Sequence, residues 1–190
     1  MTLKRLYHLI RTILIPGGGK RADYARKHNI YAHVGENVSI QSRFIPVYSE
    51  LISFGNNVFV ARNVDFVTHD VIHAVLNRLP NVSIKDYRFK EHIGCIEVKD
   101  NVMIGSNSII LYDTRIGPNV IVGSGTVVTK DLEPGFVYAG VPAKKIGTFN
   151  GFMERRETGE VSGTVSVTTH NQHLTEDEVK NAWKLFFSNH

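Results

Sequence analysis

Residues 98–133 decide the fold, because they divide into six consecutive hexads: VKDNVM, IGSNSI, ILYDTR, IGPNVI, VGSGTV and VTKDLE. Each hexad opens with Val or Ile, and in five of the six the fifth residue is small or β-branched. A period of six excludes an ordinary amphipathic helix, whose apolar stripe recurs every three to four residues. It predicts a parallel β-solenoid in which each hexad forms a short strand and a corner, and three hexads complete one triangular coil. The opening aliphatic residues should point inward and stack from coil to coil.

Gly and Asn stand at the expected corners, as at Gly117, Asn119, Gly123 and Gly125. Both residue types tolerate the backbone angles that tight turns demand. The corners are therefore expected to adopt such angles at these positions.

The hexad pattern also occurs earlier in the chain, with interruptions. VGENVS and IQSRFI run from Val34, and FGNNVF and VARNVD run from Phe54. Between Ile45 and Phe54 the phase slips by two residues, so a corner there should bulge. Over residues 70–94 the pattern disappears, and this stretch is too long for a corner. We expect it to form an excursion loop that leaves the solenoid.

Residues 1–15 carry apolar residues at helical spacing with basic residues between them. The segment is too short to span a bilayer, and Arg11 interrupts the apolar stretch that a signal peptide would need. We expect an amphipathic helix that packs on a neighbouring element, with a helix lying on a membrane surface as the alternative. PGGG at residues 16–19 should end it, and a second helix is expected over about 20–28.

The C-terminal part separates into two segments. Residues 149–172 are rich in Gly, Ser, Thr and charge, and predict an irregular arm or strand. Thr175 and the acidic residues after it predict the start of a final helix, whose aromatic stripe should pack on its own oligomer. The expected organisation is an N-terminal helical segment, 1–29, a β-helix domain, 30–148, and a C-terminal arm and helix, 149–190.

Composition narrows the class of function. The 190 residues are 42% hydrophobic, which suits one main domain, and the net charge of +4 comes without a dense Lys/Arg run. Nucleic-acid binding is therefore disfavoured, and anionic small molecules are the better partners. The single cysteine, Cys95, can form neither an intrachain disulfide nor a cysteine metal cluster, so we expect a cytoplasmic protein.

The imperfect hexads, the Thr-His-Asp step at residues 68–70, the excursion loop, the run IGPNVIVGSGTVVTKD and the closing YAGVPAKKI together resemble the hexapeptide-repeat acetyltransferases. The chain is most similar to the galactoside and maltose O-acetyltransferases and to related sugar and antibiotic acetyltransferases, over about residues 30–148. The resemblance implies a left-handed parallel β-helix, an all-β solenoid. It also implies homotrimers with active sites between subunits, acetyl-CoA as co-substrate, and no metal.

The residue that matches the family's catalytic histidine is His69. Acetyl transfer from a thioester to a hydroxyl or amine requires a base that removes the acceptor's proton, and neutral imidazole suits this role near neutral pH. Direct transfer suffices because the thioester is already activated. His73 is a competitor without a motif, and no motif surrounds His33 or His92.

The resemblance also implies binding residues. Glycine and serine at coil corners would contact the pantetheine arm of CoA, with the Ser106 amide near the oxyanion, and threonine and lysine side chains would bind the phosphates. The implied cofactor-binding set is Gly105, Ser106, Gly123, Thr129, Lys130, Lys144 and Lys145. The candidate acceptor-binding set is Tyr48, Glu50, Asp70, Tyr87 and Arg88. Met103 stands where the sugar acetyltransferases often carry Trp, which leaves the acceptor open.

The predicted function is acetyl transfer to a sugar-like acceptor, as in surface-polysaccharide synthesis. One alternative is an antibiotic or xenobiotic O-acetyltransferase of the same fold, and another is a non-catalytic β-helix scaffold. A zinc enzyme resembling the γ-class carbonic anhydrases would need several histidines on the coils. The regular hexads from Val98 contain none, which argues against that class.

Overall fold

A computed structural model describes residues 2–80, 88–158 and 174–188. The chain divides into two compact units, Met1–Phe149 and Asn150–His190. The division of the chain into 1–29, 30–148 and 149–190 stays a prediction.

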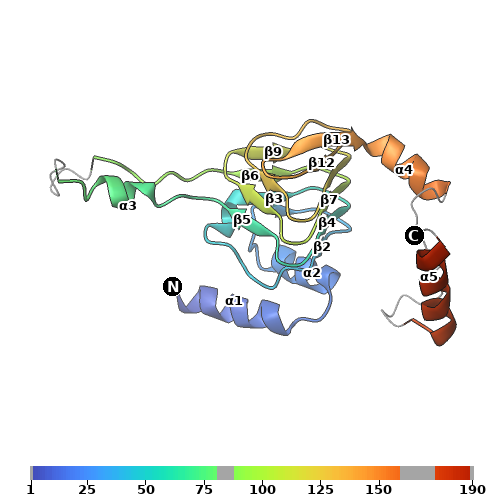
Figure 1. The fold of residues 1–190 in the computed structure, drawn as a ribbon. Coiled ribbons are helices and arrows are strands. Elements are labelled where there is room, and N and C mark those ends of the chain that lie inside the picture. The colour runs from blue at the N-terminus through green and yellow to red at the C-terminus, as the bar shows by residue number, and fades with distance from the viewer. Residues whose placement is uncertain (1, 81–87, 159–173, 189–190) are drawn as a thin grey trace. The chain divides into compact units, whose positions relative to one another are not determined.

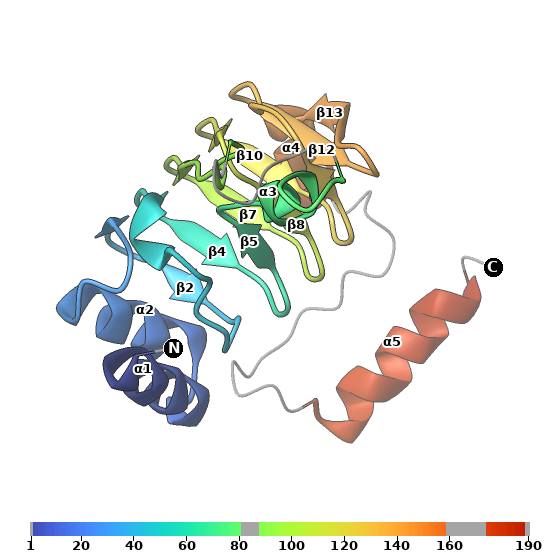
Figure 2. The same ribbon diagram turned by 90° about the vertical axis from the view of Figure 1, so that its left-hand side faces the viewer.

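Short strands of the first unit form three sheets. In Figure 2 the strands of successive coils lie side by side, as from β2 through β4 and β7 to β10. The first sheet contains β1 His33–Val34, β3 Ile52–Phe54, β6 Ile96–Val98 and β9 Thr114–Ile116. The second contains β2 Ser39–Ile40, β4 Val58–Val60, β7 Val102–Ile104, β10 Val120–Val122, β12 Phe136–Ala139 and β13 Lys144–Thr148. The third contains β5 Asp65–Val67, β8 Ile109–Leu111 and β11 Val127–Val128. From β3 to β11 the chain visits the three sheets in turn, as a parallel β-helix does.

Strand pairing follows the hexad period. Val102 pairs with Val120, and Ile109 pairs with Val127, each pair lying three hexads apart in parallel register. Ser39 pairs with Phe59, two residues more than three hexads, so the predicted phase slip is confirmed. The pairs are parallel throughout, except that β13 returns antiparallel to β12.

The core consists of the aliphatic column that the hexads predicted. The opening residues are at most 1% exposed: Val98, Ile104, Ile110, Ile116, Val122 and Val128. Stacked burial of this kind supplies most of the stabilisation of a coil that is only three short strands long. The fifth residues are buried as well, and their hydroxyl groups are satisfied locally. Ser108 and Thr126 donate to the Gly123 carbonyl at 3.0 and 2.7 Å, and Thr114 donates to the Leu111 carbonyl at 2.6 Å.

Gly and Asn occur at the corners for two different structural reasons. Asn119 and Gly125 have φ of 56° and 71°, so the expected left-handed backbone is confirmed there. Gly117 and Gly123 do not have positive φ, and that expectation is wrong for them. A Cβ atom at Gly117 would lie 2.8 Å from the Pro134 nitrogen, so glycine is needed because the next coil packs directly on the corner.

Two helices precede the β-helix: α1 Leu3–Leu14 and α2 Gly18–Lys27. Both were predicted, but α1 packs on the rest of the unit mainly with its polar side, and Leu9 is its apolar residue against the core. Thr12 is its buried residue, and the Arg5 guanidinium donates to the carbonyls of Ile45 and Pro46 at 2.9 and 3.0 Å. The expected packing on a neighbouring element is confirmed, but most of the apolar side does not take part in it within the first unit.

The excursion loop leaves after β5 and returns before β6, and in Figure 1 it projects away from the sheets. It carries α3 Ile72–Leu76. The buried Asn77 ties its two arms together, because its side chain donates to the Phe89 carbonyl at 2.8 Å and accepts from the Phe89 amide at 3.1 Å.

The chain beyond β13 is helical where the structure describes it. Helix α4, Phe149–Glu157, occupies the start of the segment predicted as an irregular arm or strand, so that prediction is wrong for these residues. Residues 159–172 of the arm lie outside the described residues. Helix α5, Glu176–Ser188, begins as predicted, and Thr175 and Glu178 form a capping box in which the Thr175 amide donates to the Glu178 carboxylate at 2.7 Å. Among the helices that the structure describes, none has the length and hydrophobicity of a membrane span.

Candidate active site

His69 lies just after β5, at the point where the excursion loop leaves the β-helix. The side chain of the preceding Thr68 is buried and donates to the Val47 carbonyl at 2.6 Å, and the Thr68 carbonyl accepts from the Gly94 amide at 2.9 Å. His69 itself forms an antiparallel bridge with Ile93. The backbone of His69 is therefore held from both arms of the loop.

The His69 imidazole packs against Tyr48. The two ring centroids are 5.2 Å apart, and the planes meet at 85°, so the contact is edge-to-face. The residue is half-buried, and its Nδ1 is buried without a hydrogen-bond partner among the described residues. An unpaired buried nitrogen is costly, so this imidazole needs an acceptor or donor that the described part of one chain does not supply.

Tyr48 owes its position to the two-residue phase slip. It has a φ of 51°, in the left-handed region, and it immediately precedes the one-turn helix η1, Ser49–Leu51. Its hydroxyl lies 3.4 and 3.5 Å from the carboxylate oxygens of Glu91, on the returning arm of the loop. The Glu91 carboxylate, followed by burial, raises the pKa of the Tyr48 phenol, which keeps it a neutral donor. Glu50, exposed on η1, adds a second carboxylate nearby.

A second network fixes the loop on the other side of His69. Asp70 accepts from the Ile72 amide at 3.1 Å and from the Tyr112 hydroxyl at 3.0 Å, so its carboxylate is occupied by groups other than the imidazole. The hydrogen bond to Asp70 raises the pKa of the Tyr112 phenol. The His92 ring packs at 4.7 Å on Tyr112, and its Nε2 lies 2.8 Å from the Asp113 carboxylate. No motif marked His92 as functional, and Tyr112 stood out only as a member of the hexad ILYDTR.

The remaining candidate acceptor residues are less constrained. Arg88 is exposed, and Tyr87 lies outside the described residues. His73, the competitor of His69, lies on α3, and its Nδ1 is also buried without a partner in the described part of the chain.

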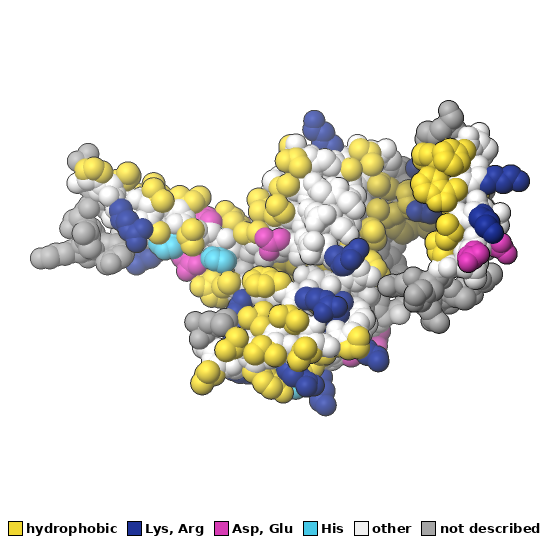
Figure 3. Space-filling model, turned by 60° about the horizontal axis from the view of Figure 1, so that its bottom comes forward, with side chains coloured by type: hydrophobic (Ala, Val, Ile, Leu, Met, Phe, Trp, Pro, Cys, Tyr) yellow, Lys and Arg dark blue, Asp and Glu magenta, His cyan; other side chains and the backbone are white. Residues whose placement is uncertain are grey.

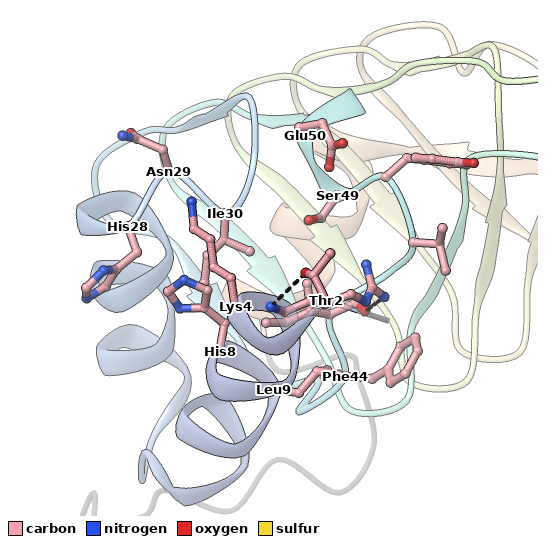
Figure 4. Close-up of a pocket in the computed structure, with 14 residues that line it drawn as sticks. Thr2, Lys4, His8, Leu9, His28, Asn29, Ile30, Phe44, Ser49 and Glu50 are labelled. Carbon is pink, nitrogen blue, oxygen red and sulfur yellow. Dashed lines mark hydrogen bonds between the residues drawn. The ribbon is translucent and has the colours of Figure 1, made fainter.

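A groove of about 1100 Å³ runs alongside Tyr48 and Glu50. Its walls come from α1, from the α2–β1 connection and from residues 44–50. Figure 4 shows Ser49 and Glu50 towards one end of the groove, and Leu9 and Phe44 towards the other. Space for a ligand is thus continuous with the residue that contacts His69.

Coil packing requires glycine at Gly105 and leaves little room at Gly123. A Cβ atom at Gly105 would lie 2.5 Å from the Ser124 nitrogen, and one at Gly123 would lie 3.1 Å from the Ala139 Cβ. Their amides donate to the Val122 and Tyr138 carbonyls of the next coil, each at 2.8 Å. Ser106 is half-buried at the same corner as Gly105.

The candidate phosphate-binding residues lie at the end of the β-helix. Thr129, Lys130 and Lys144 are exposed, and neither lysine has an ion pair with another described residue. Lys145 is committed, because its ammonium group lies 2.7 Å from the Glu133 carboxylate and 3.9 Å from the centroid of the Phe136 ring. No hydrogen bond, ion pair or ring contact joins any of the seven candidate cofactor residues to His69 within the described chain.

The comparisons with known proteins agree with this fold. Residues 96–130 match the family model described as bacterial transferase hexapeptide (six repeats). The chain therefore carries the hexapeptide repeat of bacterial transferases, and the resemblance drawn from its sequence is confirmed.

Individual relatives are acetyltransferases. The chain is 34% identical over 119 residues to the galactoside O-acetyltransferase of Escherichia coli (strain K12), covering 62% of this chain and 54% of the relative. It is 32% identical over 124 residues to the putative acetyltransferase YvoF of Bacillus subtilis (strain 168), covering 64% and 63%. The chain thus spans between half and two thirds of the length of these curated relatives.

Solved structures share the fold. A maltose O-acetyltransferase from Clostridium difficile 630 superposes with a TM-score of 0.51 at 26% identity, covering 76% of this chain and 85% of the other. A hexapeptide-repeat acetyltransferase from Vibrio cholerae O1 biovar eltor, solved with acetyl coenzyme A, has a TM-score of 0.54 at 18% identity, covering 77% and 85%. The parallel β-helix is therefore shared with these acetyltransferases.

Proposed function

We propose that this protein transfers the acetyl group of acetyl-CoA to a hydroxyl group of a sugar-like acceptor, with His69 as general base. The observation that carries the proposal is the edge-to-face contact of the His69 imidazole with Tyr48, which in turn lines a groove. The similarity to galactoside and maltose O-acetyltransferases supports the choice of reaction.

The proposed step is direct. The acceptor oxygen attacks the thioester carbonyl carbon, and its proton passes to the Nε2 of His69. The C–S bond then breaks, and the proton moves from His69 to the CoA sulfur, which leaves as the thiol. The amide near Ser106 would donate to the oxyanion that forms on the way.

We further propose that the site is completed between subunits of a homotrimer of left-handed coils, each closed as a triangle. Two features support this. The candidate cofactor residues do not contact His69 within the described part of one chain, and the buried His69 Nδ1 lacks a partner there. A neighbouring subunit with its bound CoA would bring the donor to His69 and supply a partner for its Nδ1. Lys130 and Lys144 have the exposure and charge to pair with CoA phosphates, whereas Lys145 would have to release Glu133 first.

The charge around Tyr48 favours a neutral, hydroxyl-rich acceptor. Glu50 and Glu91 both face this tyrosine, and carboxylates accept hydrogen bonds from hydroxyl groups while repelling anions. Tyr48 and Glu50, already candidates for the acceptor site, would then bind the sugar hydroxyls together with Glu91. Arg88, Tyr87 and Asp70 remain candidates on the same loop.

The first test measures CoA release from acetyl-CoA with a panel of hydroxyl sugars, amino sugars and antibiotics. His69→Ala should lower kcat by roughly 10²–10⁴, the usual contribution of a general base. Acetyl-CoA should still stabilise the variant, by on the order of 5–10 °C at 100 times Kd, because the base is not a donor ligand. The matched control is His33→Ala, an exposed histidine on β1 that should leave turnover unchanged.

Two results would contradict the proposal. If His73→Ala lost turnover and His69→Ala did not, the general base would be His73 on α3. Failure of acetyl-CoA to stabilise the wild-type chain would favour a non-catalytic β-helix.

A further inference from the structure

Helix α1 turns most of its apolar side away from the rest of the first unit. The side that faces the first unit carries Arg5, bonded to two backbone carbonyls, His8, whose Nδ1 lies 2.8 Å from the Tyr24 hydroxyl, and the buried Thr12. An amphipathic helix of a globular protein normally buries the opposite face. The polar contacts of Arg5 and His8, together with the packing of Leu9 on the core, thus orient α1 and leave the rest of its apolar stripe without a partner in the first unit.

The apolar stripe is large for so short a helix. Six side chains at helical spacing are between 39% and 85% exposed: Leu3, Leu6, Tyr7, Ile10, Ile13 and Leu14. Figure 3, which brings the α1 side forward, shows hydrophobic side chains gathered there with Lys and Arg side chains around them. A contiguous exposed patch of this kind is uncommon on a protein surface unless it binds something.

The charge around the stripe is of one sign. No Asp or Glu occurs in the chain before Asp23, whereas Lys4 and Arg11 border the stripe along one edge of α1. Arg43, exposed beside the end of α1, donates to the Ile13 carbonyl at 2.7 Å and adds a further cation. An apolar face with a purely cationic border is complementary to a surface that is apolar inside and anionic outside.

We propose that α1 is an interfacial helix that docks this protein on anionic lipid bilayers. The stripe would lie at the boundary of headgroups and acyl chains, with Lys4 and Arg11 at the lipid phosphates. At 1.5 Å per residue, twelve residues reach only ~18 Å, so the helix lies on the bilayer and does not cross it.

A second copy of the chain fits this surface less well. Stable contacts between proteins use roughly 20–30 residues a side, far more than one face of a twelve-residue helix offers. In a two-fold contact, the cationic edges of both copies would also meet and repel each other.

The test is co-sedimentation of the full chain with phosphatidylcholine vesicles that contain either no phosphatidylglycerol or about a third of it. The wild-type chain should bind the anionic vesicles and release them at high salt. Ile10→Glu should weaken binding about tenfold or more, because it places a charge in the apolar stripe. Each basic residue near an anionic surface strengthens binding about fivefold, so the Lys4→Gln/Arg11→Gln double variant should bind about 30-fold more weakly.

The matched control is Phe187→Glu on α5, a similarly exposed aromatic residue outside α1, which should bind vesicles as the wild type does. Circular dichroism should report unchanged folding for all variants, because the substituted side chains are exposed. The proposal is overturned if wild-type chain ignores anionic vesicles at low salt, or if Ile10→Glu binds them as well as wild type. If Ile10→Glu changed the mass of the assembly in solution but not vesicle binding, the stripe would be a contact between copies of the chain instead.

Discussion

At the scale of single residues, the space around a Cβ atom separates structural from functional glycines. Gly105 and Gly123 were expected to admit the pantetheine arm, but the next coil already fills the direction in which their side chains would point. A role in CoA binding would therefore act through the neighbouring surface rather than through empty space above the glycine. Contact with CoA stays a prediction for both residues.

Gly105→Ala is expected to destabilise the fold, because its Cβ would lie 2.5 Å from the Ser124 nitrogen and 2.8 Å from the Gly123 carbonyl carbon. Backbone atoms cannot turn aside as a flexible side chain can, so the cost should be about 1–3 kcal/mol. Chemical unfolding measures it, with Gly147→Ala as the control, since a Cβ atom there meets nothing within 4 Å. If the variant kept its stability but lost affinity for CoA, this glycine would be needed for ligand binding instead.

At the scale of elements, the corners of successive coils are joined by asparagine ladders. The Asn57 side chain donates to Asn101 at 2.8 Å, and Asn101 donates to Asn119 at 2.9 Å. All three residues have positive φ, between 55° and 58°. Asparagine suits such a corner twice over, since it tolerates the left-handed backbone and its amide stacks between coils.

The ladder predicts an order of stability for two variants at one position. Both variants, Asn101→Gly and Asn101→Ala, lose the two ladder hydrogen bonds. Glycine adopts the φ of 58° at this position without steric cost, whereas alanine keeps a Cβ atom there. The alanine variant should therefore be less stable than the glycine variant, by about 1 kcal/mol. Urea unfolding of both variants measures the difference, and equal stabilities would mean that the corner relaxes out of the left-handed region.

At the scale of the whole molecule, the proposed intersubunit site makes assembly a condition for the proposed reaction. The proposed homotrimer predicts a mass of about three times the 21.3 kDa of the chain in analytical ultracentrifugation. Dilution until the assembly dissociates should abolish turnover, because no single chain would then hold both halves of the site. A monomer with full activity would contradict the proposal that the site forms between subunits.

The hexads by themselves determined the β-helix, its three-hexad register, its aliphatic column and the place where the excursion loop leaves. These features are local and repetitive, because every coil has the same pattern of buried residues. The phase slip is therefore visible as an interruption of the repeat in the sequence. The final helix was predictable for the same reason, because a capping box lies within one turn. Helix α4 was missed because the Gly, Ser and Thr residues that follow it dominate the composition of residues 149–172, whereas its own residues 153–157 are good helix formers.

Only the tertiary structure decided which side of α1 faces the protein and what surrounds His69. The contacts that turn α1 join Arg5 to carbonyls some forty residues away, and Tyr48 meets Glu91 across a similar separation. Helical spacing predicts that a face is apolar but not that stronger polar contacts will hold the other face inward. Such pairings depend on how the chain returns to itself in three dimensions, which the order of residues along one segment does not encode.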